Sequence, residues 1–562
     1  MSASSDQNAK VSRRSFLKGA TVAGAAAAAG PVLWRQRAYA DAPATVPEQL
    51  HLTFGHDPTS TMVATWGVPV SAGNAALAPA VRYGLDSSYG ATAPGVVRSY
   101  YDAKDGVTAY SYHATMGGLV PATTYFYEVL NDTNGVATRG SFTTAPRGRA
   151  PFTFTSFGDQ ATPEPGNGLG GVDYSADVVG QVEKVGPAFH LLNGDLCYAN
   201  ISTNPRTQTW ADFFNNNSRS AANRPWMPAA GNHENERNNA AAIGGAASPF
   251  LAYLTRFDLP SNGSGPFAGL WYSFTYGSVR VISLNNDDVC LQDGGDTYVN
   301  NYSGGAQRSW LAGELAAARA DPGIDWVVVC MHQVAMSSAM NFNGADLGIR
   351  QSWLPLFDRY GVDLVVCGHE HHYERMHPVR GIDSGAGAPE TMRPAVQDTN
   401  TAVIDTTKGT VHMIIGGGGT SAPSNKLLYN PPMGDVIVSV SATPGSNGKR
   451  TPTKLTEAAT WSAFRDADHA YGFVGFAVDP GKVGGLTTMK ATYYVTTESL
   501  DGTAMTGVDS FVMQRPRSDA AVPIVPEFGR PALVVAGAGA VGAGALWAAR
   551  RASGARDEET TA

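Results

Sequence analysis

Five short apolar runs in the middle of the chain each end in a polar signature. The runs cover residues 152–157, 189–193, 226–230, 326–331 and 363–367, and they are followed by Gly158-Asp159, Gly194-Asp195, Gly231-Asn232-His233-Glu234, His332 and Gly368-His369. Apolar runs of this length bounded by glycine are typical of buried strands. Because ligands of α/β proteins gather beyond the carboxyl ends of strands, we expect the five endings to meet in one crevice.

Helical patterns alternate with these strands. Residues 307–320 place Trp310, Leu311 and Leu315 on one face and predict a helix, and residues 353–359 predict another. Strands alternating with helices predict an α/β domain over residues 151–420, completed by strands at 471–478, 488–497 and 509–514 within a C-terminal segment, 421–514. We interpret residues 199–224, 235–270 and 376–408 as long insertions that form the walls of the crevice.

A different pattern precedes this domain. Residues 49–54, 61–66, 80–83, 109–114 and 123–129 alternate apolar and polar positions and are separated by turn residues. Short alternating strands at this spacing predict an all-β, fibronectin III-like sandwich over residues 41–146.

Composition and charge narrow the function classes. The 562 residues are 43% hydrophobic and only 16% charged, with 64 glycines and a net charge of −8. This composition suits a compact, loop-rich protein. The acidic balance argues against a nucleic-acid-binding protein, which needs a basic face.

The two ends of the chain carry targeting patterns. Residues 1–40 combine Arg13-Arg14, an alanine-rich stretch and Ala38-Tyr39-Ala40, which predicts a twin-arginine signal, export by the twin-arginine translocase and cleavage before Asp41. After a linker at 515–530, the uncharged run 532–549 ends at Arg550-Arg551. This favours a membrane anchor over residues 531–551, with a processed sorting tail or a loosely ordered end as the alternatives.

The four cysteines do not have metal-site spacing. Cys330 and Cys367 each lie two residues before a histidine at a strand end and are expected to be buried free thiols. Cys197 and Cys290 follow apolar strands, and a disulfide between them is the less favoured alternative to two more free thiols.

The polar endings offer a consistent set of metal donors. They supply hard oxygens and imidazoles from Asp159, Asp195, Tyr198, Asn232, His332, His369 and His371. This set suits two Fe, Mn or Zn ions, and such a pair binds phosphate oxygens and converts bound water to hydroxide. Phosphoester hydrolysis is therefore the expected reaction.

The same residues resemble those of a known family. The five blocks, in this order, are similar to those of purple acid phosphatases within the calcineurin-like metallophosphoesterases, and Tyr198, three residues after Asp195, is that family's signature. Residues 47–54 and 60–66 also resemble its N-terminal domain. The resemblance implies a sandwich of two mixed sheets flanked by helices, acid phosphatase activity on phosphate monoesters, and a metal-bound hydroxide nucleophile.

The resemblance also implies a division of the ligands. Asp159, Tyr198 and His371 would hold Fe(III), while Asn232, His332 and His369 would hold divalent Fe, Zn or Mn, with Asp195 as the bridge. His233 would stabilise the phosphate or protonate the leaving group. The chain departs from the family pattern at Ala161, where a glycine is usual, and at Asn341-Phe342, where another histidine is common.

Two rival functions remain open from the sequence. A phosphodiesterase or nucleotide hydrolase would use the same metals with a cleft shaped for a second ester substituent. A catalytically inert surface-binding protein would use the sandwich for recognition and would purify without metal.

Overall fold

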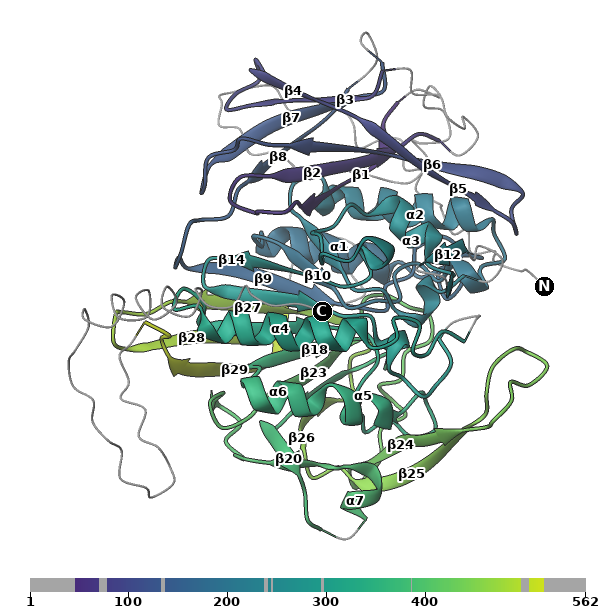
Figure 1. Cartoon of the computed structure of the whole chain (residues 1–562), viewed down its shortest axis with the longest axis vertical. Coiled ribbons are helices and arrows are strands. Elements are labelled where there is room, and N and C mark those ends of the chain that lie inside the picture. Colours follow the sequence, from purple (N-terminus) through teal and green to yellow (C-terminus); the bar gives the residue numbers. More distant parts are fainter. Residues whose placement is uncertain are drawn as a thin grey trace, which may run out of the picture.

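A computed structural model describes residues 46–69, 78–132, 137–236, 241–243, 246–294, 298–385, 387–496 and 505–519. The N-terminal part is an all-β sandwich of two four-stranded sheets, at the top of Figure 1. One sheet has the order β1 (Glu48–Phe54), β2 (Met62–Gly67), β6 (Val107–Met116), β5 (Val96–Asp102), and the other β4 (Ala91–Pro94), β3 (Ala80–Gly84), β7 (Thr124–Leu130), β8 (Thr138–Thr143). The predicted all-β domain is confirmed, and its fibronectin III-like character stays a prediction.

The first large sheet has seven strands. Its order is β11 (Trp226–Pro228), β10 (His190–Leu192), β9 (Phe152–Phe157), β27 (Gly472–Asp479), β28 (Leu486–Val495), β29 (Thr506–Pro516) and β22 (Val403–Asp405). The strands β9, β10 and β11 are parallel, whereas β27 pairs with β9 antiparallel. The C-terminal strands expected from the sequence therefore extend this sheet.

The second large sheet also has seven strands and is mixed. Its order is β14 (Tyr272–Tyr276), β15 (Val279–Ser283), β16 (Trp326–Cys330), β18 (Leu364–Cys367), β23 (Val411–Ile415), β19 (Tyr373–Met376) and β26 (Ser462–Asp466). Strands β15, β16, β18 and β23 are parallel, so their carboxyl ends lie at one edge.

Helices and smaller strand pairs surround the sheets. The α-helices are α1 (Tyr174–Val185), α2 (Arg206–Ala221), α3 (Leu251–Arg256), α4 (Ala306–Ala320), α5 (Leu347–Ser352), α6 (Leu354–Tyr360) and α7 (Ala388–Thr391). The 3-10 turns are η3 (Ala199–Ile201), η4 (Asn232–Glu234), η5 (Gly265–Phe267) and η6 (Asn286–Asp288). One small sheet contains β17 (Ala345–Asp346), β24 (Met433–Val440) and β25 (Pro452–Ala458). A second pairs β20 (Val379–Ile382) with β21 (Pro394–Val396), and a third pairs β12 (Ala241–Ile243) with β13 (Ala246–Ser248).

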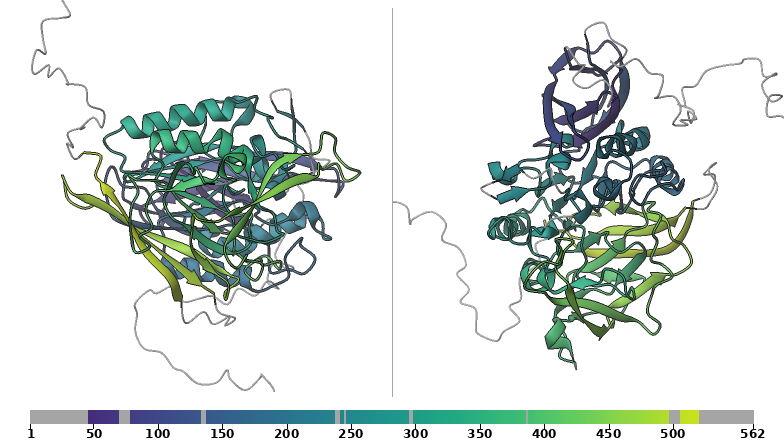
Figure 2. Two further views of the ribbon diagram at one scale, coloured as in Figure 1. Left: turned by 90° about the horizontal axis from the view of Figure 1, so that it is seen from below. Right: turned by 90° about the vertical axis from the view of Figure 1, so that its right-hand side faces the viewer.

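Strand β16 shows how the layers are built. Successive side chains of a strand point to opposite faces. Val328 and Cys330 accordingly join the core shared with the first sheet, and Val327 and Val329 join the core under α4, α5 and α6. Helices α1 and α2 pack on the first sheet's side. The predicted sandwich of two mixed sheets flanked by helices is thus confirmed, and Figure 2 shows its layers from two further directions.

The N-terminal sandwich docks on the helices of the first sheet. Strand β1 packs on α2, where the His51 ring stacks on Phe214 with centroids 4.2 Å apart. His113 Nε2 lies 2.9 Å from the carbonyl oxygen of Thr255, and Arg98 pairs with Asp258 at 2.5 Å. The sandwich therefore contacts the side of the molecule that carries β9, β10 and β11.

The structure also corrects or completes several predictions. The insertion expected at 199–224 contains the helix α2, whose buried Trp210, Phe213 and Phe214 lie at helical spacing within a polar, asparagine-rich stretch. The helices expected at 307–320 and 353–359 are α4 and α6. All four cysteines are buried and free, so Cys197 and Cys290 form no disulfide.

The predicted signal segment and the predicted anchor, 531–551, lie outside the described residues. Within the residues that the structure describes, no helix is long and apolar enough to cross a membrane.

Candidate metal centre

The seven candidate ligands come from the carboxyl ends of five parallel strands. Asp159 follows β9, Asp195 and Tyr198 follow β10, and Asn232 begins the turn η4 after β11. His332 follows β16, and His369 and His371 follow β18. The structure brings all seven side chains together in two adjoining groups.

The first group joins Asp159, Tyr198 and His371. The Tyr198 hydroxyl lies 3.2 Å from Asp159 Oδ1 and 3.2 Å from His371 Nε2, and His371 Nε2 lies 3.3 Å from Asp159 Oδ1. All three side chains are buried. Donor atoms spaced at about 3 Å are the usual arrangement around one coordinated cation.

The second group joins Asp195, Asn232, His332 and His369. Nε2 of His332 lies 3.0 Å from Asp195 Oδ2, 3.1 Å from Asn232 Oδ1 and 3.3 Å from His369 Nδ1. Asp195, His332 and His369 form a buried cluster with metal-ligand spacing. The backbone N–H of His369 donates to Asp159 Oδ2 at 2.9 Å, which links the two groups.

Backbone carbonyls fix two of the imidazoles. His332 Nδ1 lies 2.7 Å from the Asn193 carbonyl oxygen, and His371 Nδ1 lies 2.7 Å from that of Ala422. A carbonyl oxygen only accepts, so each Nδ1 carries the proton and each Nε2 keeps its lone pair for the site.

The fit of a cation follows from these lone pairs. Nε2 of His332 faces a carboxylate oxygen, an amide oxygen and a ring nitrogen, and a shared proton or a metal ion can hold these atoms together. The oxygen and imidazole donors match borderline or hard cations. The residues present therefore fit a metal centre with two adjoining positions.

Two glycines make the close approach of the ligands feasible. A Cβ on Gly231 would lie 2.3 Å from Asp195 Oδ1, and one on Gly368 would lie 2.3 Å from Asp159 Oδ2. Four of the candidate ligands, Asp159, Asp195, Tyr198 and His369, have φ between 49° and 69°. Non-glycine residues are uncommon in this region, and such strain is typical of functional sites.

Burial and charge set the protonation of the ligands in the absence of metal. Burial lowers the pKa of His332, but the charge of Asp195 and the hydrogen bond to it outweigh burial and raise the pKa to about 10. Burial and the charge of His332 keep the pKa of His369 well below its usual value. Burial and the charge of Asp159 raise the pKa of the Tyr198 phenol. A metal ion would take the place of the proton on His332 and would favour the ionised phenol.

Glu234 is a positioning residue that the sequence analysis left without a role. Its carboxylate accepts the backbone N–H groups of Asp195 at 2.9 Å, Leu196 at 2.8 Å and Gly231 at 2.7 Å. Burial, together with the charge of Asp195, raises its pKa to about 8. This carboxyl group ties the turn after β10 to the turn after β11, and its place in Gly231-Asn232-His233-Glu234 was the only sequence signal.

His233 lies beside the second group, as expected from its position next to Asn232. Its Nε2 is 3.9 Å from Asp195 Oδ2, and its Nδ1 is 2.7 Å from Asn200 Oδ1. Burial lowers the pKa of His233, the charge of Asp195 opposes this, and the charges of His332 and Lys449 add to the lowering. Asn200, two residues after Tyr198, orients the imidazole and was also missed from the sequence.

Other polar residues near the strand ends have structural partners. Asp288 accepts hydrogen bonds from the Ser303 backbone and hydroxyl, and Asp287 accepts one from Gln333. Phe342 packs edge-on against His371, with ring centroids 5.0 Å apart. The apolar ring of Phe342 thus lies beside the first group.

Comparison with known proteins places the chain in a family. The sequence model of the purple acid phosphatase N-terminal domain matches residues 47–144, that of the calcineurin-like phosphoesterases matches residues 131–373, and that of the twin-arginine signal sequence matches residues 10–30.

Curated relatives and a solved structure agree with these matches. An uncharacterized protein of Mycobacterium tuberculosis is 49% identical over 498 residues, which cover 87% of this chain and 90% of that protein. Purple acid phosphatase 18 of Arabidopsis thaliana is 28% identical over 69% of this chain and 73% of its own length.

The purple acid phosphatase from yellow lupin seeds shares the fold, with a TM-score of 0.59 at 18% identity over 87% of this chain and 78% of that one. The chain therefore belongs to the purple acid phosphatase family of calcineurin-like metallophosphoesterases and is, with that family, a phosphoric monoester hydrolase.

Proposed function

We propose that the protein is an exported acid phosphatase that hydrolyses phosphate monoesters at a centre of two metal ions. The observation that carries this proposal is the division of the buried donors into two adjoining groups, one around the Tyr198 hydroxyl and one around Nε2 of His332. Two donor groups at hydrogen-bonding distance from each other are what a metal pair requires.

The donor chemistry of each group supports a specific ion. Asp159, Tyr198 and His371 combine a carboxylate and a phenol, which as anions favour a trivalent cation, so we assign Fe(III) to them. Asn232, His332 and His369 are neutral donors that suit a divalent Fe, Zn or Mn ion, and Asp195 would be the carboxylate shared by the two ions. A relative from Arabidopsis thaliana, 27% identical over 60% of this chain, bears the name Fe(3+)-Zn(2+) purple acid phosphatase 12, which supports the Fe and Zn choice.

When bound, such a pair supplies Lewis-acid polarisation of the phosphate oxygens and activation of water. The chain's own residues hold and orient the substrate around it. His233 lies at the rim of the second group with Nδ1 held by Asn200, so its Nε2 faces the site and is placed to donate a proton to the leaving alkoxide.

Substrate and location follow from the relatives and the signal. A relative from Allium cepa, 29% identical over 60% of this chain, is named phosphoenolpyruvate phosphatase, a monoester-cleaving activity. The twin-arginine signal match supports export to the outside of the cell or its surface. Export in the folded state is compatible with a buried metal site that is filled before the chain leaves the cytoplasm.

The decisive experiment combines colour, metal content and turnover of the exported protein. We expect about two metal ions per chain, a visible charge-transfer band, and hydrolysis of 4-nitrophenyl phosphate. Tyr198→Phe should abolish the band, while Tyr101→Phe, a control at a side chain that is 60% exposed, should leave it unchanged.

A colourless but active protein would contradict the ferric assignment and leave the phosphatase. A metal-free, inactive protein would contradict the proposed function itself.

A further inference from the structure

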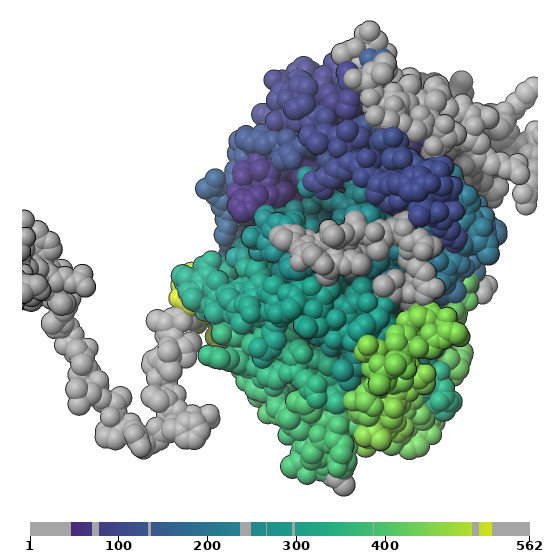
Figure 3. Space-filling view, turned by 45° about the vertical axis from the view of Figure 1, so that its right-hand side comes forward, coloured from purple at the N-terminus to yellow at the C-terminus, as the bar shows by residue number. Residues whose placement is uncertain are grey.

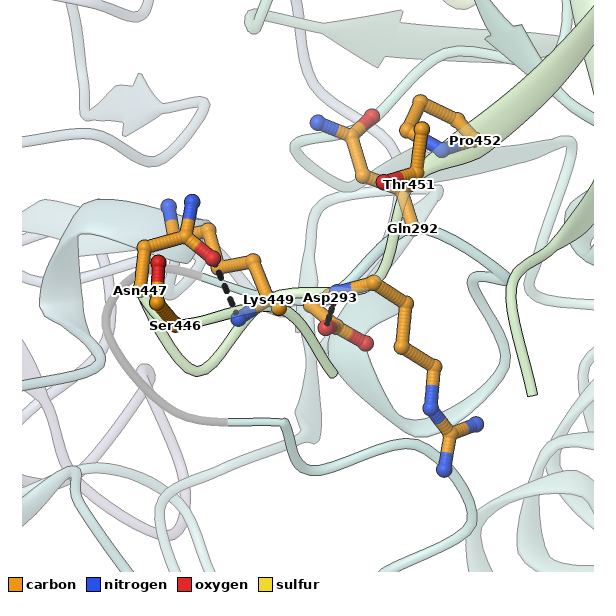
Figure 4. Close-up of a pocket in the computed structure, with 9 residues that line it drawn as sticks. Gln292, Asp293, Ser446, Asn447, Lys449, Thr451 and Pro452 are labelled. Atoms are coloured by element: carbon orange, nitrogen blue, oxygen red, sulfur yellow. Dashed lines mark hydrogen bonds between the residues drawn. The ribbon is translucent and has the colours of Figure 1, made fainter. Parts of the chain in front are cut away.

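A cavity of about 490 Å³ opens beside the tip of the β24–β25 hairpin. Figure 4 shows its walls, which come from the hairpin tip on one side and from Gln292 and Asp293 on the other. In Figure 3 the light green hairpin stands at the lower right of the visible face. None of the residues assigned to metal binding lines this cavity.

The lining of the cavity is polar and cationic. Lys449 and Arg450 contribute two positive charges against the single carboxylate of Asp293. Asp293 accepts the backbone N–H of Arg450, which fixes the hairpin tip against the opposite wall. Ser446 and Asn447 add neutral polar groups. A local positive balance is notable because the whole chain carries a net charge of −8.

The two cations are held differently. The Arg450 guanidinium lies over the Tyr298 ring, 4.0 Å from its centroid, and is committed to that contact. Lys449 is half-buried at the hairpin tip. A lysine ammonium is a point charge that suits a phosphate group approaching from several directions.

Hydrogen bonds join segments next to the cavity to segments that carry the metal centre. On one side, Asn235 Nδ2 donates to the Gly294 carbonyl oxygen at 2.9 Å, and Asn235 directly follows His233-Glu234. On the other side, Lys454 of β25 donates to the Phe342 carbonyl oxygen at 2.7 Å, and Phe342 packs on His371.

We propose that this cavity binds a second phosphate group of the substrate, so that the enzyme favours phosphoesters with two separated phosphates, with Lys449 as the residue that selects them. The inference rests on the proposed phosphatase function and deepens it. One phosphate would occupy the metal centre while the other is held by the ammonium of Lys449 and the polar groups of the hairpin tip. The acidic surface elsewhere gives a polyanionic substrate no general attraction, so this local charge would decide the preference.

A series of substrates that differ only in the second phosphate tests the proposal. Alkyl phosphates are compared with α,ω-alkanediyl bisphosphates of the same chain length, from two to eight carbons, on the metal-loaded full-length protein. At the best spacer length we expect the KM for the bisphosphate to be about tenfold lower, the size of one charge-assisted contact. This exceeds the twofold advantage of carrying two equivalent esters.

Three variants separate the charge from the fold. Lys449→Met should bring the KM values for the bisphosphate and for the alkyl phosphate of the same chain length to within about twofold of each other, and Lys449→Arg should keep the tenfold difference. Lys482→Met, in an exposed turn between β27 and β28, is the matched control and should behave as the wild type. Equal KM values for both substrate classes in the wild type, or an equal loss for both classes in Lys449→Met, would overturn the proposal.

A binding measurement keeps the two proposals distinguishable. Calorimetric titration with non-hydrolysable α,ω-alkane bisphosphonates and alkylphosphonates should reproduce the tenfold preference and its loss in Lys449→Met. If the wild type hydrolyses no phosphoester, the proposed function fails and the calorimetry alone decides the cavity. If esters are hydrolysed and the bisphosphonates bind no better than the alkylphosphonates, the phosphatase stands and the second phosphate site fails.

Discussion

The two large sheets contribute different chemistry to the same crevice. The first sheet carries every oxygen donor of the candidate centre, on the segments after β9, β10 and β11, and the second carries every imidazole, after β16 and β18. Each of the two donor groups nevertheless mixes both kinds, since His371 meets Asp159 and Tyr198, and His332 meets Asp195 and Asn232.

This division means that neither sheet holds a complete site. The donors meet only because the sheets pack face to face with their carboxyl ends at the same edge, as the shared core around Val328, Leu191 and Phe154 requires. The buried carboxylates and imidazoles therefore depend on sheet packing for their partners, and without a partner each would be costly to bury.

The largest effects on metal content and turnover are expected when one donor is removed from either sheet. Asp195→Ala and His332→Ala should each lower the metal content and reduce kcat by at least about a hundredfold, because each takes away a donor that the other sheet cannot replace. Metal analysis and turnover of purified variants measure this. Asp468→Ala, at a side chain that is 87% exposed, is the control. Full metal content and activity in either variant would show that the corresponding sheet is dispensable.

A smaller effect is expected at Asn200, which belongs to the oxygen-rich side but binds no metal in our assignment. Asn200→Ala should lower kcat about tenfold with unchanged KM and metal content, because His233 loses the acceptor for its Nδ1 proton. Asn200→Asp keeps an acceptor and should retain most of the activity. A parallel loss of metal and activity in Asn200→Ala would assign the residue a structural role instead.

The smallest effect concerns the N-terminal sandwich, which packs on helix α2 and on the segment around Thr255. Burial and the charge of Arg98 lower the pKa of His113 to about 4, although Asp258 opposes this and His51 adds to it. The folded state thus keeps His113 neutral while the unfolded chain takes up a proton below about pH 6.5. Stability should fall as pH drops from about 6.5 to 4, by at most about 3 kcal/mol from this group.

Unfolding midpoints across this pH range measure that contribution. His113→Gln should flatten the pH dependence relative to the wild type, because glutamine retains a donor for the Thr255 carbonyl oxygen without titrating. His56→Gln, at an exposed position, should leave the slope unchanged. An unaltered slope in His113→Gln would mean that the pH dependence arises elsewhere.

Much of the architecture follows from local patterns in the sequence. Apolar runs that stop at glycine predict strands, and Asp159, Asp195 and His369 directly follow the glycines that end such runs. The placement of Trp310, Leu311 and Leu315 on one face predicts α4, because one face of a helix must be apolar to pack on a sheet. These features need no knowledge of the distant chain.

Other features escape the sequence because they depend on contacts between distant segments. The asparagine-rich sequence does not predict helix α2, because several of its polar residues are buried against other elements. Asn217, for example, is buried against Gln160. The role of Glu234 depends on the backbone of Asp195, and that of Asn200 on the ring of His233. No spacing along the chain reveals such pairs.

The strand endings in the sequence were enough to nominate the seven candidate donors, because each of them follows a local strand-turn pattern. The tertiary structure decided which backbone groups orient these residues, and that a cationic cavity opens at the tip of the β24–β25 hairpin. The physical reason is that the candidate metal centre takes residues from both large sheets. The geometry of the centre therefore depends on how the two sheets pack together, and no single strand and turn determines it.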